Sequence, residues 1–305
     1  MSSDSGSVRN VAPPGWLLAG QAFFAGWIAG GAGVLAGHPL DTVKTLQQTQ
    51  TKSRTSIGSL SLLKSVWTEH GARGFYKGLT YPLVTYGAVN AAFFAAVQYS
   101  QKTTFFQSKA DENGKFNYYH LFLLGSIGGL AQVPVVSPTE LVKIKLQDQI
   151  NTGRRAYSGS IDCTIKLWKK DGTAYFLRGL SACTARDVYA WGFYWLIFET
   201  VRKKMIDQDF HYVVSELVAG GLAGFFSWAS ATPLDVVKSR MQASETKLRF
   251  SHAVNALYAE EGLKAFTRGM LVSSIRGIPS NSVTLFGFSQ MMRWCNAANE
   301  SCYGD

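Results

Sequence analysis

Three charged residues interrupt two long segments that are otherwise free of charge. Arg186 and Asp187 lie within residues 179–198, and Arg276 lies within residues 269–292. A guanidinium group matches a carboxylate with two parallel hydrogen bonds, whereas a carboxylate such as Asp187 favours a cation. Adjacent residues on a helix point about 100° apart, so we expect Arg186 and Asp187 to present two separate charges to a cavity. The set predicts a site for a zwitterion; the alternative is an arginine–acid pair that locks two helices together.

Uncharged residues at a similar depth extend this candidate site. Tyr86 lies eight residues after Gly78, as Asp187 lies eight after Gly179, and Asn90 and Tyr189 follow on the same two segments. Aromatic rings suit a quaternary ammonium or guanidinium head through cation–π contact. On a helix in lipid, however, aromatic residues are more often packing residues. Nucleotides and di- or tricarboxylates would be repelled by Asp187.

A second group of charges belongs to a motif that occurs three times. In each copy a proline (Pro39, Pro138 or Pro233) is followed two residues later by an acid and five residues later by a lysine. Acid and lysine are three residues apart and share one helix face. If the three helix ends converge, these charges form a ring of pairs between helices, here called the charge ring: Asp41, Lys44, Glu140, Lys143, Asp235 and Lys238. Such a ring is a gate or a static brace, and the two roles are not exclusive.

The spacing of these motifs predicts a chain built from three tandem units. Each unit also has a pair of glycines seven residues apart, which ends at Gly78, Gly179 or Gly269. The interval between successive motif prolines is too long for the repeat of a solenoid protein. We therefore expect one domain over residues 1–305, with repeats at about 15–105, 116–206 and 212–298.

The uncharged runs decide the fold class. Residues 10–40, 78–101, 116–139 and 217–234 carry no formal charge, and an apolar stretch of about 18 residues or more is typical of a membrane span. With the segments that hold Arg186 and Arg276, the sequence predicts an all-α membrane protein. It has six transmembrane helices, two per repeat, arranged with pseudo-three-fold symmetry around a cavity. Residues 57–70, 160–170 and 251–261 are too short to span and predict three surface helices on the side opposite both termini.

Composition argues against other functional classes. The net charge is +10, but its basic residues are scattered and form no arginine-rich block, so anionic lipid is a better partner than nucleic acid. The four cysteines have neither disulfide-framework nor metal-ligand spacing, and we expect no metal site or cofactor. No combination of nucleophile and base indicates an enzyme.

The triplicated motif resembles that of the mitochondrial carrier family (solute carrier family 25) over nearly the whole chain. The family pattern is proline, any residue, acid, two residues, base, followed further on by an acid–glycine and an aromatic–base–glycine. Two departures are Leu46, in place of a base, and His70, in place of an acid. The resemblance implies a transporter of the mitochondrial inner membrane, acting as a monomer with both termini in the intermembrane space. It makes the charge ring a matrix gate.

Further roles follow from the same resemblance. The family's glutamine braces map to Gln48, Gln147 and Gln242. Its cytosolic gate survives only as Glu199 and Arg202, since the aligned positions elsewhere are Gln98, Gln101, Ser289 and Met292. This predicts a weak cytosolic gate. Gly78, Gly179 and Gly269 start the second transmembrane helix of each repeat, where free backbone N–H groups attract phosphate. Members of the family hold cardiolipin there. The alternative is that these helix starts are simple charge caps.

The substrate class also follows from a resemblance, in this case to one branch of the family. The pair Arg186–Asp187, Arg276 with Gly277, and Gly220–Gly224 with Trp228 are similar to the amino acid and carnitine/acylcarnitine branch. The implied substrate is a basic amino acid or a methylated derivative, with carnitine or acylcarnitine as the alternative. A membrane interaction protein that no longer transports is a third reading, against which the charged cavity residues argue. His38, beside the first motif proline, is either a group that titrates near neutral pH or a hydrogen-bonded helix residue, and the second interpretation is preferred.

Overall fold

The computed structural model describes residues 14–49, 58–103, 117–153, 156–246 and 248–303, and every regular element in these ranges is a helix. The long helices are α1 (Gly15–Thr49), α3 (Thr80–Gln101), α5 (Tyr118–Thr152), α8 (Leu180–Ile206), α9 (Tyr212–Ala243) and α11 (Met270–Tyr303). The short helices are α2 (Ser59–Phe75), α6 (Ser160–Asp171), α7 (Thr173–Phe176), α10 (Phe250–Glu261) and the 3-10 helix η1 (Gly262–Thr267). The all-α class expected from the sequence is confirmed.

The order long, short, long occurs three times along the chain. The long helices begin within about two residues of the expected positions, but α11 continues to Tyr303, several residues past the expected end. The short helices α7 and η1 were not expected. Both lie between the paired glycines of the second and third repeats, where Gly172 and Gly262 take positive φ values of 57° and 65°. The left-handed backbone of these glycines separates the surface helix from the turn that follows.

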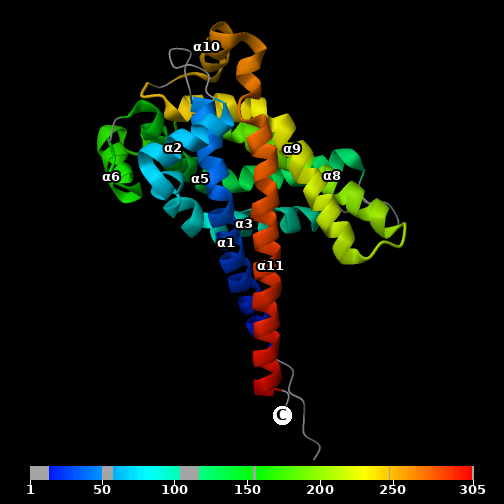
Figure 1. Cartoon of the computed structure of the whole chain (residues 1–305). Helices are drawn as coiled ribbons and strands as arrows, with labels where there is room; N and C mark the ends of the chain where they lie inside the picture. Colours follow the sequence, from blue (N-terminus) through cyan, green and yellow to red (C-terminus); the bar gives the residue numbers. More distant parts are fainter. Residues whose placement is uncertain (1–13, 50–57, 104–116, 154–155, 247, 304–305) are drawn as a thin grey trace, which may run out of the picture.

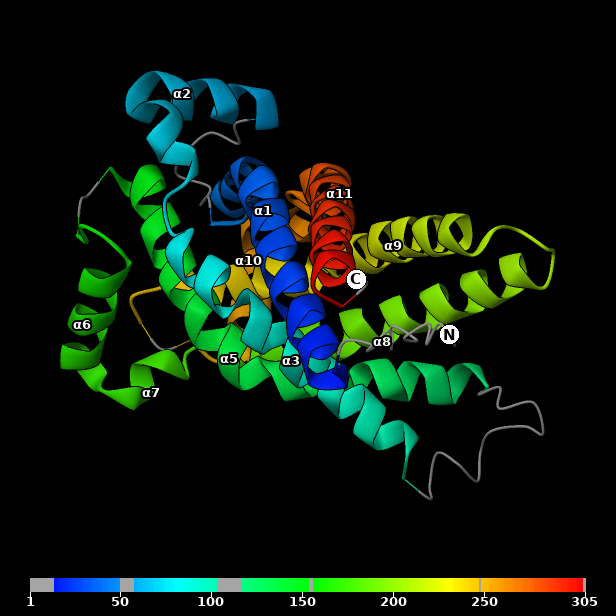
Figure 2. The ribbon, with the colours of Figure 1, turned by 90° about the horizontal axis from the view of Figure 1, so that it is seen from below.

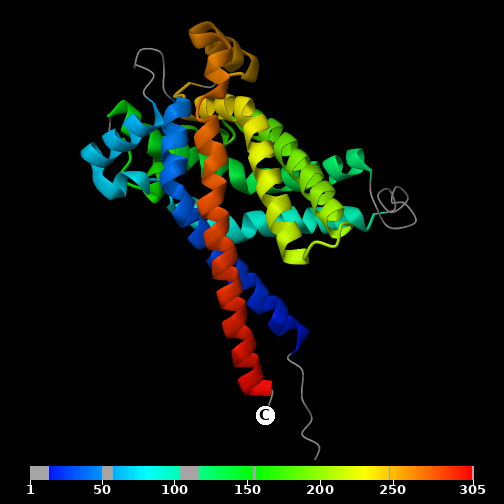
Figure 3. The same ribbon diagram turned by 45° about the vertical axis from the view of Figure 1, so that its right-hand side comes forward.

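The first and last long helices lie side by side. Figures 1 and 3 show α1 and α11 running together past the other helices toward the end of the molecule where the chain terminates. Small residues permit this approach: a Cβ added to Gly33 would lie 1.9 Å from Thr284 Oγ1, and one on Gly37 would lie 3.2 Å from Ser280. Seen from below, α3, α5, α8 and α9 complete the arrangement, and α2 and α6 lie at its periphery (Figure 2).

The glycines that precede α3, α8 and α11 link the repeats in a cycle. Gly78, Gly179 and Gly269 have φ values of 79°, 74° and 74°, which other residues rarely adopt. Each packs against the first long helix of the next repeat: Gly78 on Lys143 of α5, Gly179 on Gln242 of α9 and Gly269 on Lys44 of α1. This contact sets the depth at which α3, α8 and α11 begin relative to the charge ring.

Each surface helix buries an apolar face against the first long helix of its own repeat. Leu62 and Val66 of α2 pack on Val43 and Leu46, and the corresponding clusters join α6 to α5 and α10 to α9. Burial of one such side chain contributes about 1.5–3 kcal/mol. Leu46, which departs from the family pattern, is fully buried in this cluster. The first repeat therefore attaches its surface helix there with an apolar contact, whereas Arg240 of α9 pairs with Glu260 of α10 at 3.2 Å.

Two described helices meet a composition test for membrane spans, Tyr118–Thr152 and Val214–Ala243. The charged residues of the site described below lie on these two helices and on α1, α8 and α11. The six-span arrangement is therefore a proposal, taken up under Proposed function.

A cluster on the surface-helix side ties the second repeat to the third. The buried Lys145 donates to the carbonyl oxygens of Ala243 and Ser244 at 2.8 and 3.0 Å and pairs with Glu245 at 2.7 Å. Lys170 pairs with the second oxygen of Glu245 at 2.8 Å. Partial burial raises the pKa of Glu245, but the hydrogen bonds from Lys145 and Lys170 outweigh it and lower that pKa to about 2.

This depressed pKa gives the cluster a defined pH dependence. The stability contributed by ionised Glu245 is fully present above its ordinary pKa of 4.5 and is lost as the pH falls toward 2. We predict that Glu245→Gln has a lower Tm than the wild type at neutral pH, and that the difference shrinks between these two pH values. Thermal unfolding of the purified proteins at a series of pH values measures this. A difference that stayed constant down to pH 2 would assign the effect to side-chain shape.

Candidate functional site

The motif ends of α1, α5 and α9 meet, and every charge of the charge ring pairs with a charge from another repeat. Lys44 lies 2.6 Å from Asp235, Lys143 lies 2.9 Å from Asp41, and Lys238 contacts Glu140. These pairs join α1 to α9, α5 to α1 and α9 to α5, so they close a cycle. We call this end of the bundle the motif side. The pairing between helices expected from the sequence is present.

The three glutamines form a second cycle beside the first. Gln48 donates to Asp235 at 2.9 Å, Gln147 donates to the Thr42 hydroxyl at 3.0 Å, and Gln242 donates to the carbonyl of Ser137 at 3.4 Å. Each bond again joins consecutive odd helices. All three glutamine side chains are buried, so their hydrogen bonds form in a low-dielectric setting in which an unmade bond is costly.

His38 belongs to a local network at the same level. Its Nδ1 donates to the carbonyl oxygen of Phe75 at 2.7 Å, and Thr42 donates to that oxygen at 2.6 Å. The interpretation of His38 as a hydrogen-bonded helix residue is confirmed. Through Thr42, the network also connects Gln147 with Phe75, the last residue of α2.

Both predicted site arginines reach down to the charge ring. Two bonds of 3.0 and 2.9 Å run from Arg186 Nη2 to the oxygens of Glu140, and Arg186 Nε lies 3.7 Å from Asp235. Arg276 lies 3.1 Å from Asp41. Each acid of the ring is therefore shared between a lysine of the ring and an arginine from α8 or α11.

The expectation that Arg186 and Asp187 stand apart is wrong. Arg186 Nη1 lies 2.8 Å from Asp187 Oδ1, and the Asp187 side chain is fully buried. The long guanidinium arm folds back along α8 and spans the angle between adjacent positions. Cys183, one turn earlier, donates to the other Asp187 oxygen at 3.6 Å. Asp187 thus holds Arg186 in place and presents no free charge to a cavity.

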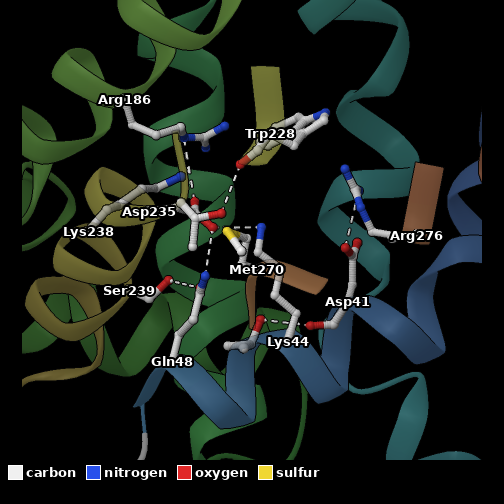
Figure 4. Close-up of polar contacts among 12 residues, drawn as sticks. Asp41, Lys44, Gln48, Arg186, Trp228, Asp235, Lys238, Ser239, Met270 and Arg276 are labelled. Carbon is white, nitrogen blue, oxygen red and sulfur yellow. Dashed lines mark hydrogen bonds and ion pairs between the residues drawn. The ribbon is translucent and has the colours of Figure 1, made fainter. Parts of the chain in front are cut away.

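Trp228 on α9 is a central residue that the sequence reasoning did not assign to the site. Cations from three repeats surround its ring: Lys44 at 5.3 Å, Arg186 at 5.4 Å and Arg276 at 5.2 Å from the centroid. Figure 4 shows Trp228 between Arg186 and Arg276, with Asp235 and Lys44 nearby. One feature of the sequence could have identified Trp228: it lies five residues before its motif proline, where the other two repeats have Val34 and Val133.

The site has an excess of positive charge and little free space. A cavity of about 70 Å³ lies among the ring, the arginines and Trp228, which is room for about two water molecules. Five cations, three lysines and two arginines, face four acids when Asp187 is included. The Nε atoms of Arg186 and Arg276 are buried without a hydrogen-bond acceptor. The arrangement can accept a carboxylate once the ring loosens.

The remaining predicted site residues have local partners. Tyr86 packs its ring against Gly30 of α1, and Asn90 donates to the carbonyl of Tyr86 at 2.9 Å. Tyr189 stacks on Phe193 of the same helix with centroids 5.7 Å apart. These contacts place the three residues on α3 and α8 and do not join them to the two arginines.

At the end opposite the motif side, the contacts are weaker. Glu199 and Arg202 pair at 2.8 Å within α8, so this pair does not bridge two helices. Between helices, Gln21 and Asn299 exchange two amide hydrogen bonds of 2.9 and 3.0 Å that join α1 to α11. Within the described ranges, the strong ionic links between long helices are on the motif side.

The ring of Trp228 provides a test of this geometry. We predict that Trp228→Leu lowers the free energy of unfolding by about 1–3 kcal/mol, since three cations lose a partly desolvated aromatic face. Trp228→Phe keeps a ring and should lose less. Chemical or thermal unfolding in detergent measures both, with the exposed Trp294→Leu on α11 as control. Equal losses in the Leu and Phe variants would show that packing volume, not the aromatic face, is responsible.

Sequence comparisons place the chain among known proteins. The profile of the family described as "Mitochondrial carrier protein" matches residues 15–108, 114–209 and 210–299. The chain is 32% identical to human "Solute carrier family 25 member 45" over 90% of this chain and 98% of that protein. It is 32% identical to the mouse "Mitochondrial carnitine/acylcarnitine carrier protein" (90% and 95% covered) and 33% identical to the rat "Mitochondrial basic amino acids transporter" (86% and 85%). The chain belongs to the mitochondrial carrier family.

Proposed function

We propose that this carrier is an alternating-access transporter of the mitochondrial inner membrane that moves a zwitterionic or cationic small metabolite. The first candidate is a basic amino acid or a methylated derivative. The observation that carries the proposal is that Arg186 and Arg276 bind acids of the charge ring. A substrate carboxylate that binds these arginines competes directly with the contacts that hold the motif side closed.

Electrostatics make such competition effective. Glu140 and Asp41 each pair with one lysine and one arginine, so removal of the arginine leaves each acid with one partner. A buried charge that loses a partner is strongly destabilised. Binding energy from the substrate carboxylate offsets this cost while the ring opens. The excess positive charge of the site favours a substrate that brings one carboxylate.

The cationic end of the substrate requires a separate partner. Asp187 is buried against Arg186, so it becomes available only if Arg186 turns toward the substrate. Trp228 already faces three cations, and the same ring can accept an ammonium or guanidinium head when those cations move. We propose Tyr86, Asn90 and Tyr189 as wall residues that bound the length of the substrate.

The remaining roles are assigned by the same logic. Six long helices span the membrane as three repeats, with the motif side toward the matrix and both termini in the intermembrane space. Gln48, Gln147 and Gln242 brace the matrix gate. The cytosolic gate is weak because Glu199 and Arg202 pair within one helix, and the unloaded carrier rests open to the cytosol. Gly78, Gly179 and Gly269 hold lipid phosphate, with cardiolipin as the expected lipid, on a functional monomer.

A carnitine or acylcarnitine substrate is the second candidate. It combines a carboxylate with a quaternary ammonium group, and one relative is named as a carnitine/acylcarnitine carrier. A membrane interaction protein without transport activity is less consistent with two buried arginine Nε atoms that lack acceptors. Uptake into liposomes loaded with arginine, lysine, trimethyllysine or carnitine separates these possibilities.

The arginines should act through geometry as well as charge. We predict that Arg276→Lys, which keeps the charge, lowers kcat/KM for the transported substrate about 10- to 100-fold, since a hydrogen bond to a charged group contributes about 1.5–3 kcal/mol. Uptake into proteoliposomes measures this. The exposed Arg293 on the same helix provides a matched control, Arg293→Lys, with unchanged uptake. Normal uptake by Arg276→Lys would remove Arg276 from the substrate site.

A change in the substrate tests the same contact from the other side. We predict that the amide or methyl ester of the transported compound neither exchanges nor stabilises the carrier, because it lacks the carboxylate that competes for the arginines. The parent acid should raise the Tm, since a ligand that binds only the folded state stabilises it. Equal Tm shifts for acid and ester would contradict carboxylate recognition.

A further inference from the structure

The three motif ends are not joined to one another in the same way. Seven residues after its motif proline, each repeat has a residue at an equivalent position: Leu46, Lys145 or Arg240. Lys145 of α5 donates to the carbonyl oxygen of Ala243 at the end of α9, at 2.8 Å. Arg240 of α9 donates to the carbonyl oxygen of Gln48 on α1 at 3.0 Å. A basic side chain thus ties α5 to α9 and α9 to α1.

The contact between the motif ends of α1 and α5, here called the α1–α5 seam, has an apolar residue at this position. Leu46 is fully buried in the cluster that α1 shares with α2, and Ile150 of α5 packs against this cluster. The donor here is a neutral amide, because Asn151 of α5 donates to the Leu46 carbonyl at 3.0 Å and to the Thr49 hydroxyl at 2.7 Å. Hydrogen bonds that involve a charged group contribute about twice as much as neutral ones. At this depth the α1–α5 seam is therefore closed without a charged donor.

Ion pairs are also distributed unequally. The helix α1 carries two charged residues, Asp41 and Lys44. Lys44 pairs with Asp235 of α9, so a single ion pair, Lys143–Asp41 at 2.9 Å, joins the described helices α1 and α5. Several ion pairs join the second repeat to the third, among them Lys238–Glu140, Lys145–Glu245 and Lys170–Glu245.

The single ion pair of the α1–α5 seam is also linked to the substrate site. Its acid, Asp41, lies 3.1 Å from Arg276 (Figure 4). A carboxylate that binds Arg276 leaves Asp41 with Lys143 as its one partner, which destabilises this buried acid. The pairs that Glu245 makes lie outside the site and remain in place. Occupancy of the site therefore weakens the seam that has the fewest charged contacts.

We propose that the motif side opens first at the α1–α5 seam, while the motif ends of α5 and α9 stay joined. Leu46 is then a positioning residue, because an apolar side chain in place of a base determines which seam separates. The inference rests on the proposed role of the charge ring as a gate and not on the identity of the substrate. A metabolite released on the motif side leaves between α1 and α5.

Distances between the three surface helices test this order of opening without a ligand, because each surface helix packs on the first long helix of its own repeat. Spin labels are attached in pairs to cysteines introduced at three equivalent, exposed positions: Thr68, Lys169 and Ala259. The four native cysteines are replaced by alanine, and the full-length carrier is reconstituted in vesicles. Double electron–electron resonance then gives one distance distribution for each pair of repeats.

Variants that remove equivalent lysines of the charge ring supply the comparison. We expect Lys143→Gln to raise the population with a longer distance between positions 68 and 169 about tenfold, the factor for a lost bond to a charged group. The matched variant Lys238→Gln should leave the distance between positions 169 and 259 unchanged, because Lys145 still holds the end of α9. If Lys143→Gln does not fold, Asn151→Ala weakens the same seam.

The converse variant moves the weak seam. Lys145→Leu combined with Lys238→Gln gives the second repeat the apolar residue of the first, and the distance between positions 169 and 259 should then lengthen. Equal changes in all three distances would overturn the proposal in favour of a symmetric gate.

Two further outcomes separate this proposal from the proposed function. A lower Tm of Lys143→Gln with all three distances unchanged would overturn the proposal in favour of a static brace. The expected distances, together with no uptake of arginine, lysine, trimethyllysine or carnitine by the same vesicles, would support the order of opening and contradict the proposed substrate class.

Discussion

The structure depends on one electrostatic constraint, which is the need to neutralise four acids and five cations within an apolar helix bundle. Buried ions carry a large desolvation cost that only close partners offset. The six charges of the charge ring meet this requirement with pairs between repeats, whereas Arg186 pairs with Glu140 and Asp187 of its own repeat. The three motif ends are thereby held together at one depth. The glycine turns and glutamine bonds follow the same cycle and support it.

The constraint also explains how a symmetric scaffold can respond to an asymmetric ligand. The lysines and acids of the charge ring are nearly equivalent in the three repeats, but Arg186, Arg276 and Trp228 have no equivalents in the first repeat. Because these arginines share the acids of the ring, a ligand that binds them acts on the ring itself. Occupancy of the site and opening of the motif side are then two consequences of one exchange of partners.

Sequence patterns predicted the repeated features well and the contacts of individual side chains poorly. Uncharged runs and proline spacing located the long helices, and the common helix face of Asp41 and Lys44 predicted pairing between repeats. The Arg186–Asp187 contact was missed because direction from the backbone does not limit a long, flexible side chain. Trp228 was missed because a tryptophan among apolar residues usually packs. The packing of the Tyr86 ring on Gly30 was not predicted, because only three-dimensional packing determines which ring meets which glycine.

Access to Cys183 tests the central claim most directly. Its Sγ lies 3.6 Å from Asp187 and 4.0 Å from Glu140, and the residue is fully buried. In a variant with Cys163, Cys295 and Cys302 replaced by alanine, a membrane-impermeant maleimide is applied to the motif side of reconstituted carrier. The account predicts little labelling without substrate and faster labelling when a transported carboxylate is present. Labelling at the same rate with and without substrate would contradict the claim that ligand and ring compete for the same arginines.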